Sequence, residues 1–153
     1  MLEIGCSDGL EAYEYSPHAW MYVGVDISDE GIKAANERGL SNAEFLVCDA
    51  HSLPFSDNQF DAIIVNSLLH HLDLEVALTE IYRVLKPSGL LIMREPLNIN
   101  PLWKVYRALT PGARTEDELP FVFTHLKLLS RYFDTSHLNY FGFFSLLSPF
   151  LKY

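Results

Sequence analysis

Short apolar stretches alternate with amphipathic segments along the first 95 residues of the chain. The apolar stretches occupy residues 1–4, 21–26, 44–49, 60–65 and 90–95. In the segment between the last two, apolar residues recur at helical spacing, at Leu74, Ala77, Leu78, Ile81 and Leu85. Strands that alternate with helices favour right-handed crossover connections between parallel strands. The pattern therefore predicts an α/β fold, a doubly wound, mostly parallel sheet with helices on both faces.

Local signals set the ends of the predicted elements. A short helix over residues 10–15 is expected to end at Pro17. The next helix is expected to take Ser28 as its N-cap and to stop at Gly39. Lys86–Gly89 should end the helix that begins at Leu74, so that the fifth strand covers residues 90–95.

The pattern changes after Pro96. Residues 101–109 and 125–133 are predicted to form amphipathic helices around a loop over 110–120, and residues 134–144 a sixth strand. The aromatic tail, residues 140–150, is too short and too interrupted to span a membrane. Either it packs on the sheet, or it contacts an acyl chain or the bilayer surface together with residues 101–109.

Composition narrows the range of partners. The chain has 153 residues, 49% of them apolar, which is typical of one folded domain. Its net charge of −9 gives no positive field for a phosphate backbone, so nucleic acid is not an expected partner. Cys6 and Cys48 are the two cysteines and are expected in the core. Without a C-x-x-C motif or a signal-like start, the sequence indicates a reducing cytoplasm.

A turn rich in small residues follows the first strand. Gly5, Ser7 and Gly9 would let the backbone come close to a ligand. A dinucleotide-binding turn needs G-x-G-x-x-G, but here Leu10 stands at the sixth position and Gly9 comes one residue early. The spacing therefore disfavours an NAD-dependent oxidoreductase.

Acidic residues end the second and third predicted strands. Ligands of parallel sheets bind beyond the carboxyl ends of the strands, and Asp26 lies about 20 residues after the glycine turn. Its two carboxylate oxygens suit the two hydroxyls of a ribose. The alternative is that Asp26 caps the following helix. Asp49 ends the third strand in the same way and could accept a hydrogen bond from an adenine amino group.

Three segments match the motifs of one family. Residues 3–9 fit E/D-x-G-x-G-x-G with Ser7 in place of the middle glycine, residues 49–61 fit D-A-x-x-L-P-F-x-D-x-x-F-D, and residues 85–89 fit L-K-P-x-G. With these motifs the chain resembles the class I S-adenosylmethionine-dependent methyltransferases, particularly the ubiquinone/menaquinone type (methyltransferase type 11). The resemblance covers residues 1 to about 95 and implies a Rossmann-like fold. Because such folds carry further elements at both ends, the chain is expected to be shortened at both.

The resemblance also implies roles for individual residues. Glu3 would lie near the ammonium of S-adenosylmethionine, Asp26 at its ribose and Asp49 at its adenine, with Ile27 and Ala50 packed against the adenine. The full set of expected cofactor-binding residues is Glu3, Gly5, Ser7, Gly9, Asp26, Ile27, Asp49, Ala50 and Asn66. One domain over residues 1–153 would then comprise a cofactor-binding core, 1–95, and acceptor-side helices with an edge strand, 96–153.

His70 and His71 are the candidate general bases. A neutral imidazole could take a proton from a hydroxyl or phenol. The alternative is that one ring faces solvent and the other donates a hydrogen bond to the backbone. A metal site would need His51 as a third ligand, and no ligand spacing supports one, so no metal is expected.

The sequence therefore predicts a cytoplasmic methyltransferase that acts on a small-molecule or lipid-like acceptor. A module of the same fold that binds the cofactor without turnover remains an alternative, because Ser7 departs from the glycine pattern. Acceptor specificity is expected in residues 95–120, which follow the fifth strand.

Overall fold

The computed structural model describes residues 1–96 and 123–133, together with His137 and Asn139. The chain divides into two compact units, Met1–Glu95 and Pro96–Tyr153.

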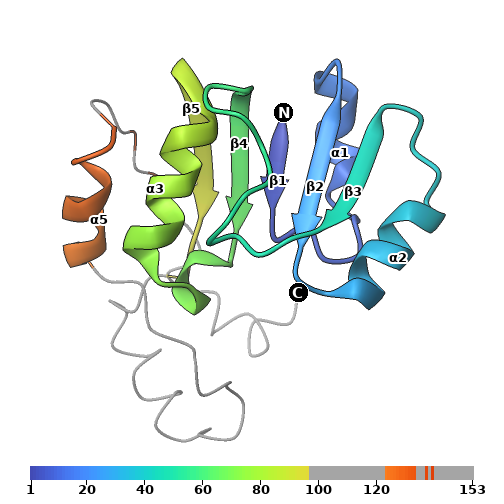
Figure 1. Cartoon of the computed structure of the whole chain (residues 1–153), viewed down its shortest axis with the longest axis horizontal. Helices are drawn as coiled ribbons and strands as arrows, with labels where there is room; N and C mark the ends of the chain where they lie inside the picture. Colours follow the sequence, from blue (N-terminus) through green and yellow to red (C-terminus); the bar gives the residue numbers. More distant parts are fainter. Residues whose placement is uncertain (97–122, 134–136, 138, 140–153) are drawn as a thin grey trace, which may run out of the picture. The chain divides into compact units, whose positions relative to one another are not determined.

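The first unit is built on a five-stranded sheet. Its strands are β1 (Leu2–Ile4), β2 (Tyr22–Asp26), β3 (Ala43–Val47), β4 (Phe60–Asn66) and β5 (Leu85–Arg94). They lie in the order β3-β2-β1-β4-β5, and every neighbouring pair is parallel (Figure 1). The predicted doubly wound, Rossmann-like α/β fold is confirmed.

The helices cover both faces of this sheet. They are α1 (Ala12–Tyr15), α2 (Asp29–Glu37) and α3 (Leu74–Val84), with short 3₁₀ turns η1 (Ser16–His18) and η2 (Leu69–His71). Figure 1 shows α3 in front of the sheet and α1 behind it. Right-handed crossovers explain this, because the chain moves outwards from β1 to β3 and then in the opposite direction from β4 to β5.

The central strands form the core. Ile63, Ile64 and Val65 of β4 are at most 1% exposed, and so are Leu2 and Ile4 of β1. A continuous apolar run is what a parallel strand needs when helices cover both of its faces. On α3, the apolar residues at helical spacing that face this core are Ala77, Leu78, Ile81 and Val84.

Some predicted boundaries were wrong. α1 ends at Tyr15 as predicted, but it begins at Ala12 and not at residue 10, and Pro17 lies in the 3₁₀ turn η1, where a proline needs no N–H partner. β3 ends at Val47, before Asp49. Ser28 caps α2 as predicted, and its Oγ accepts a hydrogen bond from the Gly31 N–H at 3.0 Å.

β5 begins earlier than predicted. It follows α3 directly at Leu85, which pairs with Phe60, and the next pair is Ala62 with Leu90. Residues 86–89 therefore form a bulge in the strand, with Ser88 at a φ of 65°. Of the two cysteines, Cys6 is buried as expected, whereas Cys48 is only half-buried.

In the second unit the structure describes one helix, α5 (Phe123–Leu129). The predicted helix over 125–133 was wrong at its end, because residues 130–132 form a turn. The predicted helix over 101–109, the loop over 110–120 and the tail over 140–150 lie outside the described residues, as does most of the sixth strand over 134–144. No helix in the described part of the chain is long and apolar enough to cross a membrane.

Candidate functional site

The loop after β1 has the backbone of a ligand-binding turn. Gly5 and Gly9 have φ values of 80° and 71°, and Ser7 between them has a φ of 47°. A Cβ on Gly5 would lie 2.9 Å from the Leu68 side chain, and one on Gly9 would lie 2.8 Å from the Ala35 Cβ. Both glycines are therefore favoured by their positive φ, and at Gly9 the contact with the Ala35 Cβ also excludes a side chain. Ser7 adopts the left-handed conformation that the missing glycine would take.

Asp26 links this loop to the start of α2. One carboxylate oxygen accepts a hydrogen bond from the Ser7 N–H at 2.8 Å, and the other accepts one from the Ser28 N–H at 2.9 Å. Because Ser28 supplies the N-cap of α2, Asp26 is not that cap. Next to it, the Ile27 side chain is 74% exposed at the end of β2. A fixed carboxylate thus stands beside an exposed apolar side chain.

Asp49 lies in the loop after β3, beside Ala50, which is half-buried. Its carboxylate accepts hydrogen bonds from the His51 N–H and from the His51 Nδ1, both at 2.8 Å. The bond from the His51 N–H, more than that from its ring, holds the pKa of Asp49 below its usual value. The His51 Nε2 accepts a hydrogen bond from the Asp73 N–H at 3.0 Å, so the imidazole joins this loop to the start of α3.

Two residues of α3 hold the loop between Asp49 and β4. The Arg83 guanidinium donates to the carbonyl oxygens of Leu53 at 2.9 Å and Phe55 at 2.7 Å, and to the Asp57 carboxylate at 2.9 Å. Glu80 accepts a hydrogen bond from the Leu53 N–H at 2.8 Å, and its bond with Arg83 lowers its pKa. Sequence reasoning recognised residues 49–61 as a motif but missed this clamp. Its only local signal was the i,i+3 spacing of the two residues.

Glu3 is placed differently from the other acidic residues. Its side chain is in the interior, 2% exposed, and its carboxyl accepts a hydrogen bond from the Tyr22 hydroxyl. Burial raises the pKa of Glu3 to about 7. The contact with a ligand ammonium stays a prediction, and the carboxyl does not lie exposed at the carboxyl end of the sheet.

Asn66, at the end of β4, belongs to a network that the sequence did not reveal. Its amide nitrogen donates to one oxygen of the Glu11 carboxylate, and the other oxygen accepts from the Arg94 guanidinium at 2.9 Å. Glu11 directly precedes α1, and Arg94 ends β5. These three residues are called the Glu11 network below.

His70 is paired with a buried carboxylate. Its Nδ1 lies 2.7 Å from an oxygen of Glu95, and the other oxygen accepts hydrogen bonds from the N–H groups of Leu68 at 3.0 Å and Leu69 at 2.9 Å. The side chains of His70 and Glu95 are 8% and 3% exposed. The alternative considered from the sequence was that one of the two histidines donates a hydrogen bond to the backbone. For His70 this was wrong, because its partner is the Glu95 carboxylate.

This pairing fixes the state of the imidazole. A carboxylate only accepts hydrogen bonds, so the neutral ring carries its proton on Nδ1 and has its lone pair on Nε2. Within the part of the chain that the structure describes, that Nε2 has no hydrogen-bond partner. His71 lies beside it, with ring centroids 4.1 Å apart, and is half-buried.

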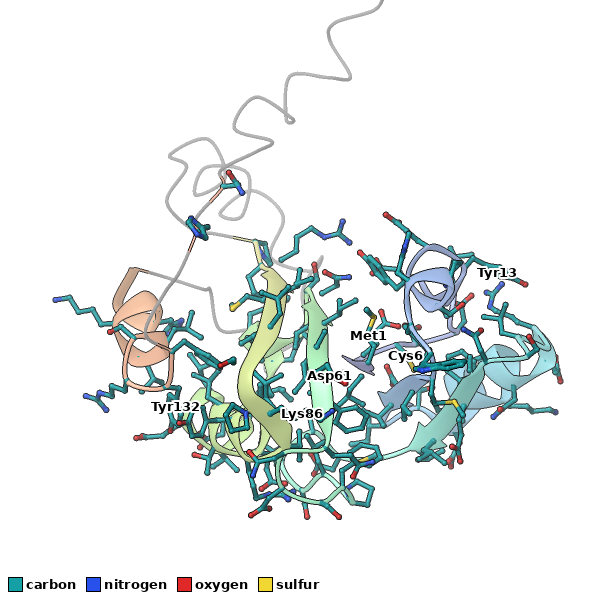
Figure 2. All side chains as sticks on the ribbon, turned by 90° about the horizontal axis from the view of Figure 1, so that it is seen from above. Met1, Cys6, Tyr13, Asp61, Lys86 and Tyr132 are labelled. Atoms are coloured by element: carbon teal, nitrogen blue, oxygen red, sulfur yellow. The ribbon has the colours of Figure 1, made fainter. Side chains whose placement is uncertain are left out.

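The strand order brings the predicted residues into one row. Asp26 and Asn66 end β2 and β4, whereas Asp49 and the loop of Gly5, Ser7 and Gly9 follow β3 and β1, all at the carboxyl end of the sheet. Met1, Asp61 and Lys86 lie instead near the amino ends of β1, β4 and β5 (Figure 2). Among residues 1–96 and 123–133, no three His, Cys, Asp or Glu side chains are arranged to hold a metal ion.

The sequence of the chain is similar to that of known methyltransferases. The family model described as a methyltransferase domain matches residues 2–93. The ubiquinone/menaquinone biosynthesis C-methyltransferase UbiE of Klebsiella pneumoniae is 41% identical over 93 residues, which are 55% of this chain and 37% of that protein. A fatty-acid O-methyltransferase of Mycolicibacterium smegmatis is 37% identical over 95 residues, which are 58% of this chain and 34% of that protein.

The fold of the chain is also similar to solved structures. The crystal structure of YcgJ from Bacillus subtilis has a TM-score of 0.71 and 27% identity, over 84% of this chain and 58% of that one. The chain matches only about a third of the length of the curated relatives.

Proposed function

The chain belongs to the methyltransferase domain family, and we propose that it binds S-adenosylmethionine at the carboxyl end of its sheet and transfers the methyl group to a small-molecule or lipid-like acceptor. The observation that carries this proposal is Asp26 at the end of β2, held by the backbone of Ser7 and Ser28 beside the exposed Ile27. The carboxylate keeps lone pairs for the hydroxyls of a ribose, and the apolar side chain offers a surface for a planar base.

The other residues of the row fit the same ligand. Asp49 carries a negative charge that suits an adenine amino group, and Ala50 and Ile27 would pack against the ring. The turn of Gly5, Ser7 and Gly9 would let the ligand approach the backbone. Ser7 keeps the required left-handed conformation, so this departure from the family motif does not argue against binding.

S-adenosylmethionine supplies an activated methyl group on a sulfonium sulfur. The bond from the methyl carbon to sulfur breaks as the bond to the acceptor atom forms, so the protein has to align the two and exclude water. When the acceptor is a hydroxyl or an acidic C–H, its proton has to leave. We assign the role of proton acceptor to the Nε2 of His70. Because Glu95 binds the Nδ1 of the same ring, the lone pair of Nε2 stays available for that proton. His71 would border the same place.

The named activities of relatives support the acceptor class. UbiE is named for ubiquinone and menaquinone biosynthesis and the Mycolicibacterium relative for fatty acids, which favours a small or lipid-like acceptor for this chain. The net charge of −9 disfavours nucleic acid. A cytoplasmic location and a contact of the aromatic tail with a membrane surface remain part of this proposal.

Calorimetric titration with S-adenosylhomocysteine, followed by a methyl-transfer assay on quinols, phenols and fatty acids, tests the proposal. We expect binding of S-adenosylhomocysteine and turnover of at least one acceptor. Binding without turnover of any acceptor would favour a cofactor-binding module. NAD(H) displacing S-adenosylhomocysteine would favour an oxidoreductase.

A further inference from the structure

The Glu11 network joins the segment after the glycine turn to the ends of β4 and β5. Glu11 and Arg94 are 83 residues apart in the sequence, and their ion pair has an N–O distance of 2.9 Å. Their side chains are 35% and 50% exposed, so a ligand can reach both. Asn66 holds the second oxygen of Glu11. A positive and a negative group thus stand side by side next to the turn.

We propose that the Glu11 network binds the amino-acid end of the methyl donor, with Glu11 on its ammonium and Arg94 on its carboxylate. The inference rests on the proposed function, because it presupposes that donor. A zwitterion carries one charge of each sign on neighbouring atoms. It can replace the contact between Glu11 and Arg94 by two new ion pairs, so that neither side chain loses a partner of opposite charge.

The order of the strands supports this assignment. Asp49 and Asp26 place the adenine and ribose over β3 and β2, at one side of the turn. The amino-acid chain leaves the ribose on the other side of the nucleoside from the base, so it points along the row towards β1 and β4. Neighbouring strands lie about 4.8 Å apart, so Asn66 on β4 is about two strand spacings from Asp26 on β2.

Glu3 is less suited to the ammonium than Glu11. Its carboxyl is 2% exposed and bonded to the Tyr22 hydroxyl, and burial raises its pKa to about 7, so its negative charge is incomplete near neutral pH. Glu11 is half-buried, with 35% of its side chain exposed, and already pairs with a cation. Geometry and charge therefore both favour Glu11.

Three ligands separate the contribution of the ligand's ammonium to binding from that of its carboxylate. S-adenosylhomocysteine has the ammonium and the carboxylate, its decarboxylated analogue has only the ammonium, and 5′-methylthioadenosine has neither. Calorimetric titration of all three would be made on the unmodified chain, Glu11→Gln and Arg94→Met. Lys86→Met is the matched control, because Lys86 forms a similar exposed pair with Asp61, at 2.7 Å, near the amino ends of the strands.

For Arg94→Met we expect affinity for S-adenosylhomocysteine to fall about 10-fold, while affinity for the other two ligands stays within about twofold. For Glu11→Gln we expect similar losses, about 10-fold, for both ligands that carry the ammonium and none for 5′-methylthioadenosine. Glutamine keeps an oxygen for Asn66, so this variant should fold normally. The control should bind all three ligands like the unmodified chain.

Equal losses for all three ligands, or no loss for any, would overturn the inference while leaving the proposed function intact. An unmodified chain that binds neither S-adenosylhomocysteine nor 5′-methylthioadenosine would overturn both. Thermal unfolding of each variant shows whether a loss of affinity reflects a loss of folded protein, and Glu11→Gln alone suffices for the decision if Arg94→Met does not fold.

Discussion

The two ends of the parallel sheet carry their charged side chains in different ways. Near the amino end, Lys86 and Asp61 pair with each other at the surface, with 43% and 78% of their side chains exposed. At the carboxyl end, Asp26 accepts hydrogen bonds from the backbone N–H groups of Ser7 and Ser28, and Glu95 accepts them from those of Leu68 and Leu69. Backbone donors fix the position and direction of a carboxylate, whereas an exposed pair between flexible side chains contributes little.

This difference predicts where substitutions change function. At the carboxyl end they should alter turnover or ligand affinity. Near the amino end they should alter stability, or nothing at all. The variants of His70, Glu3 and Asp26 are therefore each paired with a control residue from the other end of the sheet or from the surface.

The largest effect is expected at His70. If its Nε2 takes the acceptor proton, His70→Gln should lower kcat for a hydroxyl acceptor by about 10²- to 10⁴-fold, with affinity for S-adenosylhomocysteine nearly unchanged. Glu95→Gln should lower kcat less and shift its pH profile, because Glu95 acts by orienting the ring. His18→Gln, in η1, is the control. An unchanged kcat in His70→Gln would exclude it as the base.

The next effect concerns the buried Glu3 in the interior of the sheet, which should make stability depend on pH. Its pKa is raised from 4.5 to about 7 in the folded chain, so the folded state binds this proton more tightly than the unfolded state. The resulting stability is fully present below pH 4.5 and is lost as the pH rises through about 7. The difference corresponds to roughly 3 kcal/mol in the free energy of unfolding.

Urea unfolding between pH 4.5 and 8 measures this effect. Glu3→Gln should flatten the pH dependence, since an amide keeps an acceptor for the Tyr22 hydroxyl but does not titrate. Glu44→Gln, on the exposed side of β3, should leave it unchanged. The same slope in the unmodified chain and in Glu3→Gln would show that another group is responsible.

At Asp26, ligand affinity and stability should both change. If Asp26 binds the ribose as proposed, Asp26→Ala removes charge-assisted hydrogen bonds worth about 1.5–3 kcal/mol, or about 10- to 150-fold in affinity for S-adenosylhomocysteine. It also leaves the N–H groups of Ser7 and Ser28 without their acceptor, so the free energy of unfolding should fall as well. Asp26→Asn should lose less of both.

The control at the opposite end is Asp61→Ala, which should bind S-adenosylhomocysteine like the unmodified chain. A 2′-deoxy analogue should be nearly insensitive to Asp26→Ala if the 2′-hydroxyl provides most of the contact. Unchanged affinity in Asp26→Ala would remove the main support for a nucleoside at this strand end.

The sequence could predict what depends on neighbouring residues. Alternation of apolar strands with helices gave the parallel sheet, and Ser28 was recognisable as a cap because it precedes an acidic first helical turn. Asp26 was recognisable because strand ends of a parallel sheet meet at one place. These features follow from local pattern combined with a general rule of topology.

Contacts between distant segments could not be predicted in this way. Nothing near Glu11 indicates that Arg94 will pair with it, and nothing near His70 indicates a carboxylate from residue 95. Such pairs depend on the register of β4 and β5, which the bulge at residues 86–89 shifts. The bulge itself was missed because Pro87 and Gly89 are typical of a turn between elements.

The smallest effect on ligand binding is expected at Arg83. This residue tests the comparison of the two ends of the sheet most strictly, because it contacts a loop that connects them. Arg83 lies near the end of α3, where its own carbonyl oxygen accepts a hydrogen bond from the Asn58 N–H just before β4 begins, at 2.9 Å. It therefore acts near the amino end of the sheet, yet it holds the loop that comes back from Asp49. Arg83→Met leaves the carbonyl oxygens of Leu53 and Phe55 without this donor and should lower the free energy of unfolding by about 1–3 kcal/mol. Affinity for S-adenosylhomocysteine should fall no more than about threefold, because the Asp49 carboxylate keeps both of its bonds from His51. Urea unfolding and calorimetric titration of the same variant measure the two effects. A large loss of affinity at nearly unchanged stability would show that the two ends of the sheet are coupled through this loop.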